Sequence, residues 1–208
     1  LEIVSFDDWR KVYARDYYGN NLPGWPVEIG FLYDASNSNP TLADIDGDNS
    51  LDVIFGGEDR SYTGDWLFAY NSAGQNLPGF PVRSLNSYAS FTSIPVADID
   101  NDGKPEIISA ESYYLRVYEN DGSLKWEFPK NYQTSEPIVI ADLDGNGSAE
   151  IITTELERVY VLDNNGGMLP GWPRSILPGW NISANVAVGD LDGDSQLEFI
   201  NSVIWLPN

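Results

Sequence analysis

The sequence predicts an all-β protein of the β-propeller class, built from about four blades' worth of four-stranded antiparallel sheets. Three observations lead to this prediction: a nine-residue acidic loop recurs four times, short apolar runs flank every copy, and no helical periodicity is found. The ninth positions of the loops are 54, 44 and 48 residues apart. Such a period is typical of propeller blades and other repeat arrays.

The first two predicted strands of each period lie on either side of the acidic loop. Both runs are short and rich in β-branched residues, as expected for strands that are covered on both faces. We name the run before the loop strand A; its copies are residues 42–43, 96–97, 140–141 and 188–189. The run after the loop is strand B, with copies at 53–54, 107–108, 151–152 and 199–200. Residues 1–4 align with 149–152 and predict a further strand B at the start of the chain.

A third apolar run and a proline-rich motif complete each period. The third run, strand C, has copies at 12–14, 67–69, 117–119 and 159–161, each followed by a turn rich in Asn, Asp and Gly. The motif Leu-Pro-Gly-aromatic-Pro follows at 22–26, 77–81 and 169–173, whereas the third period has only Leu-Lys-Trp-Glu-Phe-Pro at 124–129. Proline lacks the amide donor that a central strand requires, so we expect this element to form an edge strand D.

The inventory of 17 predicted strands defines one domain over residues 1–208. We divide it into a partial blade at 1–35, complete blades at 36–88, 89–133 and 134–182, and a partial blade at 183–208. A closed four-bladed ring would need about 16 strands and would leave one strand B over. We therefore favour an arc of a larger propeller of about seven or eight blades, with the closed four-bladed ring as the alternative.

The four acidic loops have the ligand spacing of a calcium site. Calcium takes about 6–8 oxygen ligands, which side chains at loop positions 1, 3 and 5, the carbonyl of position 7 and the carboxylate of position 9 would supply. Glycine at position 4 or 6 permits the positive φ that a tight wrap requires. The predicted ligands are Asp44, Asp46, Asp48, Ser50 and Asp52 in loop 1; Asp98, Asp100, Asp102, Lys104 and Glu106 in loop 2; Asp142, Asp144, Asn146, Ser148 and Glu150 in loop 3; and Asp190, Asp192, Asp194, Gln196 and Glu198 in loop 4.

Two other interpretations of the loops explain less. A helix-loop-helix calcium site needs an acidic residue at position 12, where this chain has Phe55, Ser109, Thr153 and Asn201. Solvated acidic turns would explain a single copy, since Asp, Asn and Gly are ordinary turn residues. Four copies with the same spacing would repel themselves without a cation, which favours metal binding. Loop 3, where Asn146 replaces a carboxylate, is expected to bind most weakly.

The composition restricts the classes of partner and chemistry. With 32 acidic and 11 basic residues, the net charge of −21 argues against nucleic acid and anionic lipid as partners. The chain has no cysteine and no histidine, which excludes disulfides, thiolate catalysis and a histidine general base within it. No apolar run reaches the roughly 18 residues of a membrane-spanning helix, so direct membrane insertion is not expected.

The loop pattern resembles that of a known repeat family. A small residue, then Asp-x-Asp-x-Asp-Gly-x-x-Glu, then two aliphatic residues is similar to the FG-GAP or VCBS repeat, known from the propeller of integrin α subunits and from many secreted microbial proteins. The Leu-Pro-Gly-Trp-Pro motif looks like the version found in microbial extracellular members. The resemblance implies a propeller with calcium in each A–B loop and an extracellular or cell-surface location. The Phe-Gly signature is approximated only at Phe55-Gly56-Gly57, so integrin-type ligand recognition is not implied.

These observations predict a non-catalytic, calcium-stabilised propeller module that acts as a scaffold or as an adhesive surface for a protein or carbohydrate ligand. One alternative is the propeller portion of a calcium-dependent polysaccharide lyase, in which metal and a basic side chain would act on an acidic sugar. Another is a subunit of an extracellular fibre, whose end blades neighbouring subunits would complete. Asn181-Ile182-Ser183 matches an N-glycosylation acceptor in a predicted surface connection.

Overall fold

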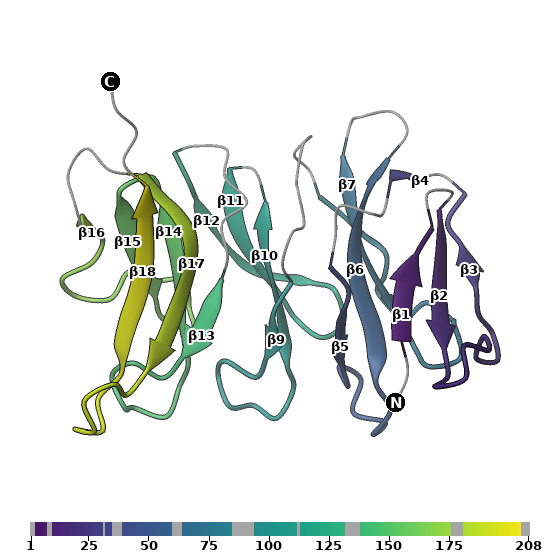
Figure 1. The fold of residues 1–208 in the computed structure, drawn as a ribbon, viewed down its shortest axis with the longest axis horizontal. Coiled ribbons are helices and arrows are strands. Elements are labelled where there is room, and N and C mark those ends of the chain that lie inside the picture. The colour runs from purple at the N-terminus through teal and green to yellow at the C-terminus, as the bar shows by residue number, and fades with distance from the viewer. Residues whose placement is uncertain are drawn as a thin grey trace.

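Five antiparallel sheets stand side by side in a row (Figure 1). The computed structural model describes residues 3–7, 10–30, 32–34, 39–59, 64–84, 94–111, 113–131, 138–175 and 181–204. Every regular element in these segments is a β-strand, and they contain no helix that is long and apolar enough to cross a membrane. The first and last sheets lie at opposite ends of the row and do not pair within the described residues. The fold is thus an open arc of propeller blades and not the closed four-bladed alternative, while the blade number of a complete ring stays a prediction.

We number the sheets as blades in the order of the chain. Blade 1 contains β1 (Ile3–Phe6), β2 (Lys11–Arg15) and β3 (Val27–Glu28). Blade 2 contains β4 (Leu32–Asp34), β5 (Thr41–Ala43), β6 (Asp52–Asp59), β7 (Asp65–Tyr70) and β8 (Val82–Arg83). Blade 3 contains β9 (Val96–Ala97), β10 (Glu106–Glu111), β11 (Tyr114–Tyr118) and β12 (Leu124–Pro129). Blade 4 contains β13 (Val139–Ala141), β14 (Glu150–Glu155), β15 (Arg158–Leu162) and β16 (Arg174–Ser175). The last sheet contains β17 (Asn181–Gly189) and β18 (Glu198–Ile204).

The hydrophobic core lies between the blades, as the continuous apolar runs predict. Strands β10 and β14 are buried along their whole length because a neighbouring blade covers each face. Ile54 and Leu67 of blade 2, for example, pack in one cluster with Ile107 of blade 3. Three further clusters join the remaining neighbouring sheets in the same way. Adjacent blades therefore stabilise one another by burial of apolar surface.

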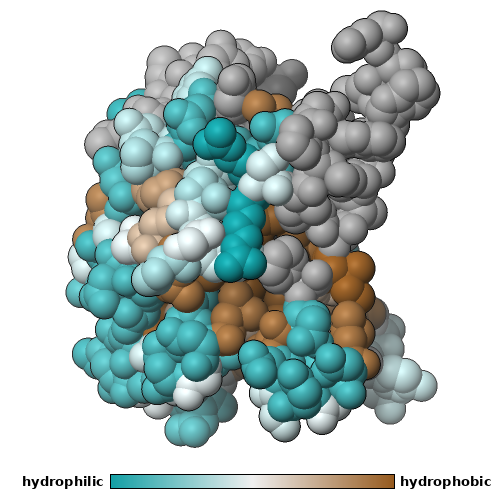
Figure 2. Space-filling view, turned by 90° about the vertical axis from the view of Figure 1, so that its left-hand side faces the viewer, coloured by the Kyte–Doolittle hydropathy of each residue, from teal (hydrophilic) through white to brown (hydrophobic). Residues whose placement is uncertain are grey.

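At the end of the row this burial is incomplete. Figure 2 looks onto the end formed by β17 and β18 and shows apolar surface, in brown, beside hydrophilic loops. Leu191 is 63% exposed and Ile200 is 53% exposed. A further blade would cover a surface of this kind.

The Leu-Pro-Gly-aromatic-Pro motif forms a turn and not strand D itself, so this prediction was wrong. In the first copy the Leu22 amide donates to the carbonyl of Ala14 at 2.8 Å, and the Trp25 amide donates to the carbonyl of Leu22 at 3.1 Å. The strand begins only after the second proline, as the short β3, β8 and β16. Proline cannot donate to a ladder, and Gly24 has a φ of 88°, which an extended strand does not allow. Blade 3 lacks the motif, and there β12 runs without interruption from Leu124 to Pro129.

Two further features differ from the sequence-based expectations. Strand β4 lies before the predicted blade boundary at residue 35, yet it pairs with the far end of β6 in blade 2. Asn181 does not lie in a connection, because it opens β17 and pairs with Ile204; its side chain lies outside the described residues.

The tryptophans of these D-strand segments reach into the next blade. The indole N–H of Trp25 donates to the carbonyl of Ser72 at 3.0 Å, and that of Trp126 donates to the carbonyl of Asn164 at 2.9 Å. Each acceptor lies in the turn between strands C and D of the following blade. The same contact between blades explains why residue 24 is a glycine, since a Cβ there would lie 1.9 Å from the carbonyl oxygen of Ala73.

A buried polar cluster provides a second link between blades 2 and 3. Glu111, at the end of β10, accepts hydrogen bonds from the hydroxyls of Ser84 at 2.6 Å and Tyr118 at 2.8 Å, and it pairs with Arg116. Arg116 also contacts Glu127 at 3.0 Å. Because the Glu111 carboxylate is fully buried, these partners take the place of its hydration.

Candidate metal centres

The four acidic loops connect strand A to strand B in successive blades and lie along one edge of the arc, at the bottom of Figure 1. Loop 1 (44–52) joins β5 to β6, loop 2 (98–106) joins β9 to β10, loop 3 (142–150) joins β13 to β14, and loop 4 (190–198) joins β17 to β18. The fold therefore repeats one candidate site in each of four neighbouring sheets.

The backbone frame of the loops is the same in all four copies. The amide of position 2 donates to the carboxylate of position 9: Ile45 to Asp52, Ile99 to Glu106, Leu143 to Glu150 and Leu191 to Glu198, at 2.7–2.9 Å. The amide of position 7 donates to the side chain of position 5: Ser50 to Asp48, Lys104 to Asp102, Ser148 to Asn146 and Gln196 to Asp194, at 2.7–2.8 Å. Positions 4 and 6 both have positive φ: Gly47 and Asn49, Asn101 and Gly103, Gly145 and Gly147, Gly193 and Ser195.

In every loop this frame brings three carboxylates together. Their oxygens lie within 4.8 Å of one another in Asp44, Asp46 and Asp48; in Asp98, Asp100 and Glu106; in Asp142, Asp144 and Glu150; and in Asp190, Asp192 and Asp194. These four clusters could hold metal ions. The other predicted ligands lie in the same loops but outside these groups: Ser50, Asp52, Asp102, Lys104, Asn146, Ser148, Gln196 and Glu198. For the members of the four clusters and for these residues alike, the ligand role stays a prediction.

Asp52 is the buried carboxylate of loop 1. Its side chain is fully buried; Oδ2 accepts a hydrogen bond from the Ile45 amide at 2.9 Å, whereas the buried Oδ1 has no hydrogen-bond partner among the described residues. Burial raises the pKa of Asp52 to about 6, and repulsion from Asp46, Asp48 and Asp44 adds to the shift. An ionised carboxylate in this position needs a positive partner, and a divalent ion held by the loop carboxylates would supply it.

Loop 3 shows the same feature at another position. Asp142 Oδ1 is buried without a hydrogen-bond partner in the part of the chain that the structure describes, and burial raises the pKa of Glu150. In loops 1 and 3 the residues present therefore fit a cation of the oxygen-binding kind.

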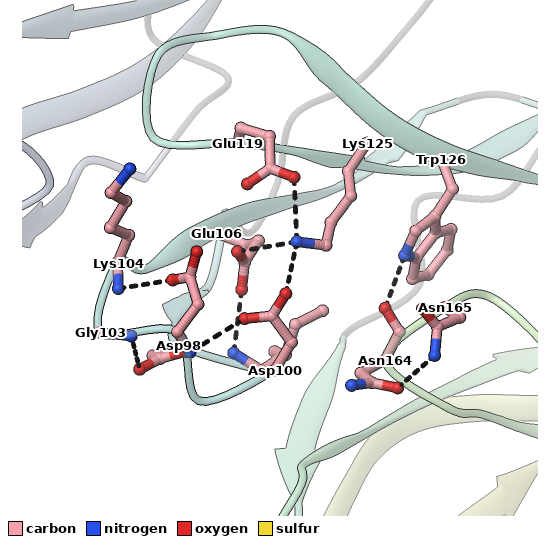
Figure 3. Close-up of polar contacts among 12 residues, drawn as sticks. Asp98, Asp100, Gly103, Lys104, Glu106, Glu119, Lys125, Trp126, Asn164 and Asn165 are labelled. Carbon is pink, nitrogen blue, oxygen red and sulfur yellow. Dashed lines mark hydrogen bonds and ion pairs between the residues drawn. The ribbon is translucent and has the colours of Figure 1, made fainter.

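Loop 2 already has a cation beside it. Figure 3 shows the Nζ of Lys125 between three carboxylates: it lies 2.8 Å from Asp100 Oδ2, 2.9 Å from Glu119 Oε1 and 3.2 Å from Glu106 Oε1. The hydrogen bond from Lys125 is the main cause of the lowered pKa of Asp100. Burial alone would lower the pKa of Lys125, but its hydrogen bonds to the carboxylates raise it above its usual value. Sequence reasoning missed this contact, and the available signal was the lysine standing where other periods have the proline motif.

Fold and site together define the class of protein: an array of propeller blades, each with an acidic loop between its first two strands. The model of the FG-GAP-like repeat matches residues 44–109, 98–153 and 142–200, and each match begins at the first aspartate of a loop. The three matches span well over half of the chain, which belongs to the FG-GAP-like repeat family.

One solved structure supports the fold, and two others are similar at a lower level. The Vibrio cholerae biofilm matrix protein Bap1 is 23% identical with a TM-score of 0.55, over 79% of this chain and 28% of that one. BBS1N, in its complex with ARL6DN, is 18% identical with a TM-score of 0.49, over 80% of this chain and 56% of that one. A protein of unknown function from Bacteroides caccae is 14% identical with a TM-score of 0.49, over 98% of this chain and 76% of that one. The chain thus spans 28% and 56% of the first two structures. No curated protein matches it significantly.

Proposed function

We propose that this chain is a calcium-stabilised, non-catalytic propeller module of an extracellular or cell-surface protein, where it serves as a scaffold or as a ligand-binding surface. The observation that carries the proposal is the orphaned, fully buried Oδ1 of Asp52 beside three further carboxylates. A folded chain tolerates such an arrangement if a cation neutralises it.

Calcium is the cation that this donor set suits best. The loops offer carboxylate, amide and backbone oxygens, with neither sulfur nor imidazole, and hard oxygen ligands favour calcium over softer metals. In loop 1 Asp44, Asp46 and Asp48 would hold the ion, and Asp52 would complete the shell from the start of β6. The ion would supply positive charge and connect the end of strand A to the start of strand B.

The proposed location follows from the affinity expected of such loops. Extracellular calcium-binding modules have dissociation constants on the order of 10⁻⁴–10⁻³ M, which suits an ion present at millimolar levels outside cells. The fold shared with a protein described as part of a biofilm matrix supports an extracellular setting.

The non-catalytic part of the proposal is supported by the use of the described charged groups. Glu111 and Arg116 pair with each other in a blade interface, and the loop carboxylates hold the turn frame together. These groups thus have structural tasks, and among the described residues no observation favours the lyase or the fibre subunit over a scaffold.

The proposal is tested by scanning calorimetry of the chain in about 5 mM calcium and in excess chelator, with bound calcium counted by elemental analysis after desalting. Each occupied loop should add about 1–2 kcal/mol of stability, so the melting temperature should rise by several degrees with calcium. Magnesium, which keeps its water ligands, should have a smaller effect. Equal melting temperatures in calcium and chelator would refute the proposal.

A further inference from the structure

Loop 2 differs from loop 1 in the contacts of the carboxylate at position 9. Asp52 and Glu106 both occupy position 9, and each gives one oxygen to the amide of position 2. The second oxygen of Asp52 is buried and has no hydrogen-bond partner within the described segments, whereas the second oxygen of Glu106 accepts a hydrogen bond from Lys125 Nζ at 3.2 Å. The same ammonium lies 2.8 Å from Asp100. Asp100 and Glu106 are two of the three carboxylates that could hold a metal in loop 2.

A β-bulge places Lys125 at this point. In the pairing of β11 with β12, Val117 lies opposite Trp126 and Tyr118 lies opposite Leu124, so Lys125 is the extra residue between two ladder positions. Bulges commonly re-aim a side chain. The other blades have Pro23, Pro78 or Pro170 after the corresponding leucine, and proline offers no cation.

The short turn of blade 3 contributes the third carboxylate. In blade 4 the first residue of the turn is Asp163, whose side chain accepts hydrogen bonds from the amides of Asn165 and Gly167. In blade 3 Asp121 accepts the Ser123 amide instead, and Glu119 is left to bind Lys125 at 2.9 Å. The lysine side chain is only 16% exposed, so solvent screens these contacts less than it would on an open surface.

We infer that Lys125 is a built-in counter-cation of loop 2, which holds this loop together without metal and makes it bind calcium more weakly than the other loops. The inference rests on the proposed calcium function of those loops. It places the weakest site in loop 2, whereas the sequence pointed to loop 3 because of Asn146. An ion entering loop 2 must displace the ammonium or lie beside a like charge, and either should weaken binding by at least about tenfold.

The test is calcium binding to the full chain by isothermal titration calorimetry and native mass spectrometry. K125M removes the ammonium but keeps an apolar stem of similar length, and K11M makes the same charge change in blade 1, which has no acidic loop among the described residues. K125M should gain one calcium site, or tighten one by at least about tenfold, while K11M binds calcium as the unmodified chain does. Adding D98N to K125M should remove the gained site, which assigns it to loop 2.

A second measurement separates this inference from the proposed function. In excess chelator K125M should melt several degrees below K11M, because Glu106 is fully buried and loses its ammonium partner. Calcium should restore most of that loss. If K125M and K11M bind calcium alike and melt alike in chelator, the inference is overturned while the proposed function stands. If no form of the chain binds calcium, the proposed function fails, and the weak-site part of the inference fails with it.

Discussion

The substitution D52N should have opposite effects on stability in the presence and in the absence of calcium. Asparagine keeps the size of the side chain and an oxygen for the Ile45 amide, but it removes the charge. In chelator this charge destabilises the folded chain, because Asp52 is buried beside three other carboxylates and its pKa is raised to about 6. In calcium the same carboxylate would coordinate the ion and so stabilise the loop.

The size of the effect follows from the pKa. An acid whose pKa is raised in the folded state binds more protons folded than unfolded, so stability is highest below the unfolded pKa and falls as pH rises through the folded one. A shift from 3.8 to about 6 would be worth about 3 kcal/mol for a fully desolvated group, and we expect about 1–2 kcal/mol after solvent screening. In chelator at pH 7, D52N should therefore melt about 2–8 °C above the unmodified chain, with the difference vanishing near pH 4.

In about 5 mM calcium the order should reverse. The unmodified loop gains about 1–2 kcal/mol from the ion, and most of this gain is lost when a carboxylate ligand becomes an amide. Scanning calorimetry of both proteins at pH 4 and pH 7, in calcium and in chelator, measures the reversal. E28Q removes one charge from an exposed residue of blade 1 and serves as the control for net charge. If D52N were destabilising under both conditions at pH 7, the reasoning from the orphaned oxygen would be refuted.

Three further predictions concern the joints between blades and the choice of ion. Gly24 and Gly171 share a φ of 88°, but a Cβ at Gly24 would lie 1.9 Å from a carbonyl oxygen, whereas one at Gly171 would meet only the flexible end of Arg174 at 3.5 Å. In urea denaturation G24A should therefore lower the free energy of unfolding by at least about 1–3 kcal/mol more than G171A does. Equal losses of stability would contradict this. R116M leaves the buried carboxylate of Glu111 without its cation and should cost about 3–5 kcal/mol, of which adding E111Q should restore a part; no recovery in the double variant would count against the pairing. Calcium should raise the melting temperature more than magnesium at equal concentration, and the reverse order would exclude calcium as the favoured ion.

The blade arrangement could be predicted from the sequence because its signals are local and repeated. Strands A, B and C occur where apolar runs flank the acidic loops, since a strand covered on both faces must be apolar along its length. The loop frame could also be predicted, because the sequence shows acidic residues at alternate positions and, between them, residues that adopt positive φ. Asn101 and Ser195 also have positive φ, which shows that the loop frame imposes this conformation on residues other than glycine.

The features that were missed depend on contacts or register that no local pattern encodes. The prolines of 22–26 correctly excluded a central strand, but their missing donors removed them from the ladder altogether. Strand β4 pairs with the far end of β6 through a register shift, which apolar periodicity does not show. The position of Lys125 depends on a bulge and on a shortened turn that act together, and only the folded sheet shows that its ammonium faces loop 2.

The indole contacts of Trp25 and Trp126 run in one direction along the chain, from a blade to its successor. Blades 1 and 3 thus supply the donor of such a joint, and the C–D turns of blades 2 and 4 supply its acceptor. A blade that took both roles would add a whole unit to the row with the same kind of joint on each side.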